Sequence, residues 1–306
     1  MLNKIRPYYK THLGASYLGD SLELVKKIDN ERIDLILTSP PFALTRQKEY
    51  GNKSAEEYVE WFLKFAYEFK RILSEKGSFV LDLGGAYLPG LPVRSIYQYE
   101  LLTKLCKDAG FFLAQEFFHY NPARLPSPTE WVNVRRIRVK DSVNLVFWLS
   151  KTEFPRADNK KILKPYSDSM KQLLKNGYDA KLRPSGHDIS EKFSRNNNGA
   201  IPPNLLTIAN TESNSSYLRK CKEADIKPHP ARFPKEFAEF FIKFLTDEND
   251  LVFDPFAGSN TTGYVAEILG RRWIAFELKE EYLSGSKLRF DESPTLFSQF
   301  VKDGAA

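Results

Sequence analysis

The chain has 306 residues, 42% of them hydrophobic and 27% charged, which suits a large α/β domain that carries an insertion. Its net charge of +6 and pI near 9.0 allow an acidic partner such as nucleic acid without requiring one. Two cysteines, four isolated histidines and the lack of a signal peptide or long apolar span favour a soluble intracellular protein without a disulfide framework or a metal site.

Short β-rich runs alternate with amphipathic helical patterns, which predicts a mainly parallel sheet with helices on both faces. The predicted strands are 15–19, 33–38, 78–83, 112–120, 142–149, 251–254 and 273–277. The predicted helices are 21–28, 55–73, 96–109, 235–246 and 261–269. In the second helix the aromatic residues recur at helical spacing, which favours a core-facing stripe over a cofactor-binding motif. These residues are Tyr58, Trp61, Phe62, Phe65 and Phe69.

The first unusual stretch is LTSPPF, residues 37–42, which directly follows an apolar run typical of a buried strand. Such strands seldom end in two prolines, because proline lacks a backbone N–H and fixes its own φ. The pair predicts a stiff turn that aims polar atoms in one direction. Taken in isolation, Ser-Pro-Pro is also typical of linkers, and the buried strand before it argues against that interpretation.

The second unusual stretch is LVFDPFAGSNTTG, residues 251–263, in which a short strand ends in Asp254, a Gly/Ser turn follows and a helix begins near Thr261. Small residues let a ligand approach the backbone, and the helix N-terminus offers free N–H groups. Glu277 ends the next strand about 20 residues on, where nucleoside-binding folds hold ribose hydroxyls. Neither G-x-G-x-x-G nor GK[ST] is present, which favours a nucleoside without pyrophosphate. An ordinary strand–turn–helix with a solvated Glu277 is the alternative.

Between about Asn121 and His229 proline, asparagine, serine and basic residues become more frequent, which predicts an inserted region of long loops that meets a partner. Within it NVRRIRVK, residues 133–140, places Arg136, Arg138 and Lys140 on one face if the segment is extended. We expect these residues, with Arg135, to contact the phosphates of a nucleic-acid partner. A solvated basic strand is the alternative.

The two unusual stretches together resemble the beta class of DNA amino-methyltransferases, in which the catalytic tetrapeptide precedes the S-adenosylmethionine motif. The matching blocks run from about Gly19 to Glu277 and are TSPPFAL…KEYGN, GGAY, LPSPTEWVN, IRVKDSVN, PYSD, RPSGHDI, IPPNLL, HPARFP and GSNTTG. The resemblance implies a Rossmann-like α/β methyltransferase core with circularly permuted motif order. Residues 1–120 and 229–290 with strand 142–149 would form that core, about 121–228 the target-recognition insertion, and 291–306 a C-terminal tail.

Site roles also follow from the resemblance. The implied catalytic residues are Ser39, Pro40, Pro41, Phe42 and Asp82. The implied cofactor-binding residues are Asp20, Thr38, Phe233, Pro234, Asp254, Pro255, Phe256, Ala257, Gly258, Ser259, Asn260, Thr261 and Glu277. Alternatives remain for three positions: Asp82 as a loop cap, Asp20 as a helix N-cap, and Pro234 as a first-turn proline. His229 has no acidic neighbour in the sequence, which favours a structural role.

The resemblance implies methyl transfer from S-adenosyl-L-methionine to cytosine N4 in double-stranded DNA, with base flipping, without a metal and in a prokaryotic cytoplasm. Its most similar members imply the target CAGCTG with the inner cytosine modified, within a restriction-modification system. A monomer is expected, and a cognate endonuclease would share the target without binding the protein. Adenine N6 methylation, a silent DNA-binding protein and RNA methylation remain alternatives. Carbon-5 methylation is disfavoured, because neither Cys106 nor Cys221 lies in a Pro-Cys loop.

Overall fold

The computed structural model describes residues 2, 5–43, 54–176, 195–210 and 215–290. The blocks KEYGN (48–52) and RPSGHDI (183–189), the last residue of TSPPFAL and the expected tail 291–306 lie outside these residues. The described residues form two compact units: those within 1–157 and 204–290 form the first, and those within 158–203 form the second.

The first unit is built on a nine-stranded sheet with the order β1-β2-β9-β8-β3-β4-β6-β5-β7. Its strands are β1 (Tyr9–Lys10), β2 (Gly14–Leu18), β3 (Ile33–Thr38), β4 (Leu73–Leu83), β5 (Phe112–Tyr120), β6 (Val143–Ser150), β7 (Leu205–Thr207), β8 (Leu251–Asp254) and β9 (Arg272–Glu277). Every strand predicted from the sequence is present. β1 and β7 were not predicted, because two or three residues are too short to show an alternating pattern.

The α-helices of the first unit are α1 (Ser21–Val25), α2 (Ala55–Ile72), α3 (Tyr97–Lys107), α5 (Ser216–Glu223), α6 (Lys235–Leu245), α7 (Thr261–Ile268) and α8 (Glu280–Lys287). The five predicted helices are confirmed with small shifts at their ends. α5 and α8, of eight residues each, were not predicted. A π-helical turn, η1 (Glu130–Val134), lies between β5 and β6.

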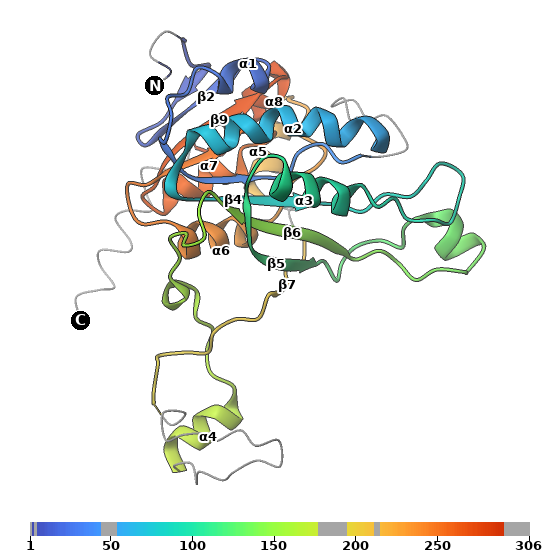
Figure 1. Ribbon diagram of the computed structural model, residues 1–306, viewed down its shortest axis with the longest axis vertical. Coiled ribbons are helices and arrows are strands. Elements are labelled where there is room, and N and C mark those ends of the chain that lie inside the picture. The colour runs from blue at the N-terminus through green and yellow to red at the C-terminus, as the bar shows by residue number, and fades with distance from the viewer. Residues whose placement is uncertain (1, 3–4, 44–53, 177–194, 211–214, 291–306) are drawn as a thin grey trace. The chain divides into compact units, whose positions relative to one another are not determined.

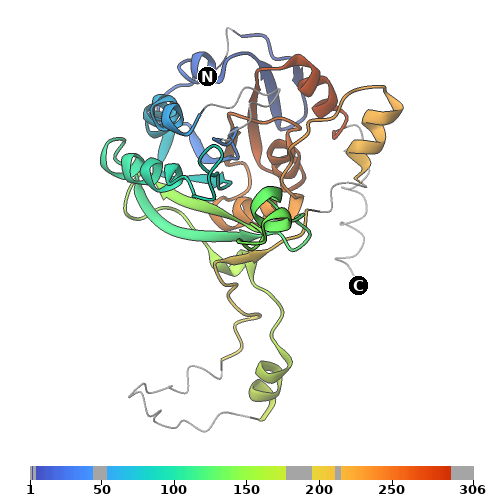
Figure 2. The same ribbon diagram turned by 90° about the vertical axis from the view of Figure 1, so that its right-hand side faces the viewer.

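The prediction of a mainly parallel sheet is confirmed, since among the described strands only β1 and β6 run antiparallel to their neighbours. β2, β9, β8, β3 and β4 are parallel neighbours, so their carboxyl ends meet at one edge. β6 runs antiparallel to both β4 and β5. Figures 1 and 2 show β6 (light green) beside β5. As a result, the start of β6 lies beside the end of β4, which matters for the site.

Aromatic side chains join the helices to both faces of the sheet. The stripe on α2 packs Phe62 and Phe69 against Phe79 of β4, with ring centroids 6.3 and 5.3 Å apart. Figure 1 shows α6 on the opposite face of the sheet from α2. There the ring centroid of Phe241 of α6 lies 5.2 Å from that of Phe117 of β5. Phe62, Phe69 and Phe79 are fully buried. The stripe is therefore core, as predicted, except where it reaches the cavity described below.

The second unit, Asp158–Pro203, occupies the middle of the region expected to be the insertion. It contains the 3-10 turn η2 (Asn159–Ile162) and α4 (Asp168–Asn176), the yellow-green helix in Figure 2. Lys164 and Ala200 form an antiparallel bridge, with N–H···O distances of 2.9 and 2.8 Å. α4 buries none of its residues.

Candidate functional site

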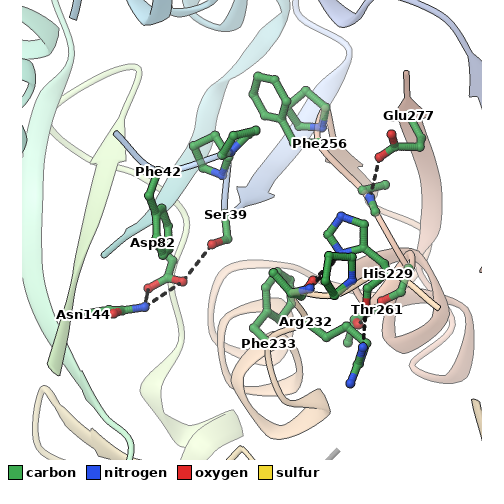
Figure 3. Close-up of a pocket in the computed structure, with 18 of the residues that line it drawn as sticks. Ser39, Phe42, Asp82, Asn144, His229, Arg232, Phe233, Phe256, Thr261 and Glu277 are labelled. Atoms are coloured by element: carbon green, nitrogen blue, oxygen red, sulfur yellow. Dashed lines mark hydrogen bonds between the residues drawn. The ribbon is translucent and has the colours of Figure 1, made fainter. Parts of the chain in front are cut away.

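A cavity of about 450 Å³ opens at the carboxyl edge of the parallel strands. This is the edge at which open α/β sheets bind ligands, and the volume is within the usual range for small-molecule sites. Two turns face each other across it: the Ser-Pro-Pro elbow, residues 39–42 after β3, and the glycine turn, residues 255–261 after β8. Figure 3 shows Ser39 and Asp82 on one side and Glu277 beside the glycine turn on the other.

The elbow is fixed by buried neighbours on both sides of its prolines. Ser39 donates a hydrogen bond from Oγ to Asp82 Oδ2 at 2.9 Å. The Phe42 ring lies directly on Gly84, where an added Cβ would come within 2.5 Å of the ring. Glycine at 84 is thus required for Phe42 to line the cavity, which accounts for the first residue of the GGAY block.

Asp82 lies at the end of β4 and is only 2% exposed. Asn144, at the start of β6, donates from Nδ2 to Asp82 Oδ1 at 3.1 Å. Burial raises the pKa of Asp82, and nearby His119, the Ser39 hydroxyl and Asn144 partly offset that rise. The acid therefore orients two side chains and is not a simple loop cap.

The glycine turn is held by Glu277 at the end of β9. Glu277 accepts hydrogen bonds from Gly258 N at 2.9 Å and from Lys279 N at 2.9 Å. Gly258 has φ +51°, which glycine adopts freely. Burial raises the pKa of Glu277, with these N–H groups opposing the rise. Buried Arg289 donates to the Ser259 carbonyl and hydroxyl at 2.7 and 3.0 Å, which fixes the rest of the turn.

Asp254, in contrast, makes its hydrogen bonds inside the protein and not toward the cavity. Its carboxylate accepts from the Thr38 and Thr262 hydroxyls, both at 2.7 Å, and from Phe256 N at 3.0 Å. Burial raises its pKa to about 6. Asn260 is the left-handed N-cap of α7 and bonds Gly263 N and the Tyr9 hydroxyl. Thr38, Asp254 and Asn260 do not line the cavity but shape the turn that does.

The segment before α6 closes a further side of the cavity. His229, Phe233 and Pro234 all line it. The His229 ring lies on Gly258, where a Cβ would come within 3.1 Å, and stacks edge-on to Tyr282 at 4.4 Å. Burial lowers the pKa of His229 to about 4, so the ring is neutral at ordinary pH. Its packing fits the expected structural role, although it lies at the cavity wall.

Most residues assigned from the sequence meet at this cavity. Those that line it are Asp20, Ser39, Pro40, Pro41, Phe42, Asp82, Phe233, Pro234, Pro255, Phe256, Ala257, Gly258, Ser259, Thr261 and Glu277. Asp20 is also the N-cap of α1, accepting from Leu22 N at 2.8 Å.

The basic segment corrects one expectation. Residues 133–140 are not an extended strand, because η1 covers the first of them and Arg136 has a left-handed φ of 56°. Arg135 pairs with Glu130 at 2.8 Å, Arg138 donates to the Pro92 carbonyl, and Lys140 donates to the carbonyls of Pro122 and Arg124. The segment is exposed, and its backbone does not follow the alternating strand that the expectation assumed.

Several cavity residues were missed by sequence reasoning. Trp61 and Phe65 of the aromatic stripe reach the cavity beside Phe256, with ring centroids 5.8 and 5.1 Å from it. The other missed residues that line the cavity include His119, Asn121, Arg124, Asn144, Asn210, His229 and Arg232. Asn144 and Arg232 lie inside two matching blocks, IRVKDSVN and HPARFP, which was the available signal.

Two searches of the described residues found nothing. No group of three or more His, Cys, Asp and Glu side chains there could hold a metal ion. No described helix is long and apolar enough to cross a membrane.

Comparison with known proteins identifies relatives over most of the chain. The family model described as DNA methylase matches residues 33–288. The type II methyltransferase M.PvuII of Proteus hauseri is 56% identical over 288 residues, which is 93% of this chain and 86% of the relative. M.ScaI of Streptomyces caespitosus is 28% identical over 95% of this chain and 86% of the relative.

Solved structures agree with these relatives. The PvuII DNA methyltransferase, described as cytosine-N4-specific, has a TM-score of 0.78 and 47% identity, covering 97% of this chain and 93% of its own. The M1.HpyAVI complex with S-adenosylmethionine has a TM-score of 0.52 and 17% identity, covering 91% of this chain and 100% of its own, so it supports the fold alone.

Proposed function

The chain belongs to the N6/N4 DNA methylase family, and on that premise we propose that it transfers the methyl group of S-adenosyl-L-methionine to cytosine N4 in double-stranded DNA. One observation carries the proposal: the Ser-Pro-Pro elbow and the glycine turn line the same cavity. Transfer requires donor and acceptor to meet in one place, so the same two turns in separate places would have excluded it.

The glycine-turn side of the cavity, meaning residues 255–261 with Glu277, fits the nucleoside part of the cofactor. Glu277 presents a carboxylate at the end of β9, where ribose hydroxyls are held in related folds. Phe256, Trp61 and Phe65 form an aromatic wall suited to an adenine ring. Asp20 lies at the cavity with a carboxylate able to accept from an amino group. When bound, the cofactor supplies an electrophilic methyl group on sulfur.

The elbow side, meaning residues 39–42 with Asp82, Asn144 and Arg124, fits the base. An exocyclic amine is a poor nucleophile, because its lone pair is delocalised into the ring. Ser39 gives its own hydrogen to Asp82, so its Oγ remains an acceptor for an amine hydrogen. The Pro40 carbonyl offers a second acceptor, and Phe42 a stacking surface worth about 1–3 kcal/mol. Holding the amine in this way favours attack through nitrogen.

Proton removal needs no unusual base. The methylated amine is transiently cationic and strongly acidic, so it loses a proton readily. Asp82 can take up that proton through Ser39 Oγ. Burial favours the protonated form of Asp82, which is why it raises the pKa of this carboxyl. A stacked base cannot reach the cavity, so the target nucleotide is expected to flip out of the duplex.

The test is to incubate the protein with duplex DNA and S-adenosylmethionine and to analyse the hydrolysed DNA by mass spectrometry. N4-methylcytosine is expected, and Ser39→Ala should lower its rate of formation about 10- to 100-fold, the value of one lost hydrogen bond to a reacting group. N6-methyladenine in its place would overturn the base assignment. No product combined with no cofactor binding in a titration would favour a silent DNA-binding protein.

We further propose that the target is CAGCTG with the inner cytosine modified, because the relative at 56% identity matches most of the chain. Action as a monomer within a restriction-modification system, with an endonuclease that shares the target without binding the protein, completes the proposal. Digestion of methylated plasmid with a panel of restriction enzymes tests the target. Protection at other sequences only would refute it.

A further inference from the structure

The elbow side contains a chain of hydrogen bonds whose direction is fixed. Arg124 Nη1 donates to Asn144 Oδ1 at 3.0 Å. A guanidinium can only donate, so Asn144 must turn its oxygen toward Arg124 and its Nδ2 toward Asp82. Asp82 then accepts from both Asn144 and Ser39. The chain therefore presents an acceptor at its Ser39 end and a cation at its Arg124 end.

Arg124 is held at the cavity by the loop that carries it. Lys140 Nζ donates to the carbonyls of Pro122 and Arg124 at 3.3 and 3.2 Å. Asn121 Oδ1 accepts from the backbone N–H groups of Ala123 and Asn210 at 3.1 and 3.2 Å. Arg124 is half-buried and lines the cavity, and within the described residues only one of its N–H groups makes a hydrogen bond. The remaining donors are available to a ligand.

The two candidate bases differ in what they offer such a cation. Cytosine presents an amine donor, the N3 acceptor and the O2 acceptor in a row. Adenine presents an amine donor and the N1 acceptor, and then a C–H group. An amine held at Ser39 therefore leaves a second acceptor for a cation beyond it only when the base is cytosine. An unmatched buried donor is costly, which makes this difference selective.

We propose that Arg124 binds the N3–O2 edge of the flipped cytosine and so gives the site its preference for cytosine over adenine. The inference rests on the proposed methyl transfer and deepens it by naming a specificity-determining residue. Lys140 becomes a positioning residue for the Arg124 loop. A DNA phosphate is the other partner that Arg124 could take, and the experiment separates the two.

The experiment uses the full chain and duplexes that carry the mapped target, with cytosine or adenine at the methylated position and adenine opposite in both. Arg124→Met keeps the length of the side chain and removes its donors. We expect the single-turnover rate and the affinity for the cytosine duplex to fall about 10- to 100-fold, the value of hydrogen bonds to a charged group. The values for the adenine duplex should stay unchanged, and Arg124→Lys should recover part of the cytosine preference.

Controls distinguish the failures. Arg219→Met, on the exposed face of α5 and away from the cavity, should leave all values unchanged. S-adenosylmethionine affinity should be unaltered in Arg124→Met. Equal losses on both duplexes with a smaller salt dependence would mean a phosphate contact, and no loss on either would also overturn the proposal. Absence of methylation by the wild-type chain would refute the proposed function, while binding to the same two duplexes built on CAGCTG would still decide the role of Arg124.

Discussion

The two sides of the cavity each contain a buried aspartate at a strand end, yet the two acids have different partners. Asp254, under the glycine turn, accepts hydrogen bonds from Thr38, Thr262 and the Phe256 N–H; the two threonines do not line the cavity, and Phe256 belongs to the turn that does. Asp82, on the elbow side, accepts from Ser39 and Asn144, which both line it.

This difference separates two uses of a buried acid. Asp254 fixes the shape of a backbone turn, so its loss should appear mainly in stability. Asp82 fixes which polar atoms of other side chains remain free for a substrate, so its loss should appear mainly in the rate. Glu277 lies between the two cases, because it holds the turn and also faces the cavity.

The largest effect is expected at Asp82. In Asp82→Asn an NH₂ group replaces one of the two oxygens that accept from Ser39 and Asn144. With that NH₂ group toward Ser39, the Ser39 hydroxyl would accept from the amide and turn its own hydrogen toward the cavity, where the amine hydrogens must be held. We expect the methylation rate at saturating substrates to fall about 10²- to 10⁴-fold. Asp108→Asn, at the exposed end of α3, is the matched control. A methylation rate equal to that of the control would show that Asp82 does not orient the groups that hold the base.

A pH-dependent stability change is expected at Asp254. Burial raises its pKa to about 6 from 3.8, so between these values the unfolded chain loses the proton first. Raising the pH through this window therefore favours unfolding, by something on the order of 3 kcal/mol. Asp254→Asn stays neutral in both states and should show a flatter dependence. Urea unfolding of the wild-type protein and of Asp254→Asn from pH 4 to 7 measures the free energy of unfolding. The same change with pH in both proteins would contradict the prediction.

A smaller effect is expected at Glu277. Glu277→Gln keeps the side-chain shape but turns an NH₂ group toward one of two backbone donors, at Gly258 or Lys279. We expect S-adenosylmethionine to bind about 10-fold more weakly, with the rate at saturating cofactor retained. Calorimetric titration with S-adenosylmethionine measures this affinity. Glu281→Gln, which changes an exposed acid of α8, is the matched control. Unchanged affinity would place the cofactor elsewhere.

The smallest effect concerns the exposed loop beyond the elbow side. Arg136 makes no hydrogen bond or ion pair with the described residues, whereas Arg138 is bound to the Pro92 carbonyl. Arg136→Gln should reduce the slope of log affinity for DNA against log salt by about 0.9, the value of one phosphate contact. Arg138→Gln should change it less. A larger change in the slope for Arg138→Gln than for Arg136→Gln would contradict this assignment of the phosphate contact.

Much of the molecule could be predicted from the sequence, because the periodicity of strands and helices and the proline and glycine residues of turns can be recognised within a few residues of chain. The runs before Ser39 and after Leu251 identified the strands that carry both turns, and proline and glycine marked where the turns lie. The extended interpretation of residues 133–140 failed, because alternation of charged and apolar residues says nothing about a left-handed Arg136.

The sequence by itself determined the fold class, both turns and the acids at the strand ends, since each depends on neighbours a few residues apart. Only the tertiary structure decided that Asn144 and Arg124 complete the elbow side, because β6 enters the sheet antiparallel between β4 and β5. That strand order brings Asn144 to Asp82 across 62 residues of chain. Periodicity reports which face of a strand is buried, but not which strand lies next to it.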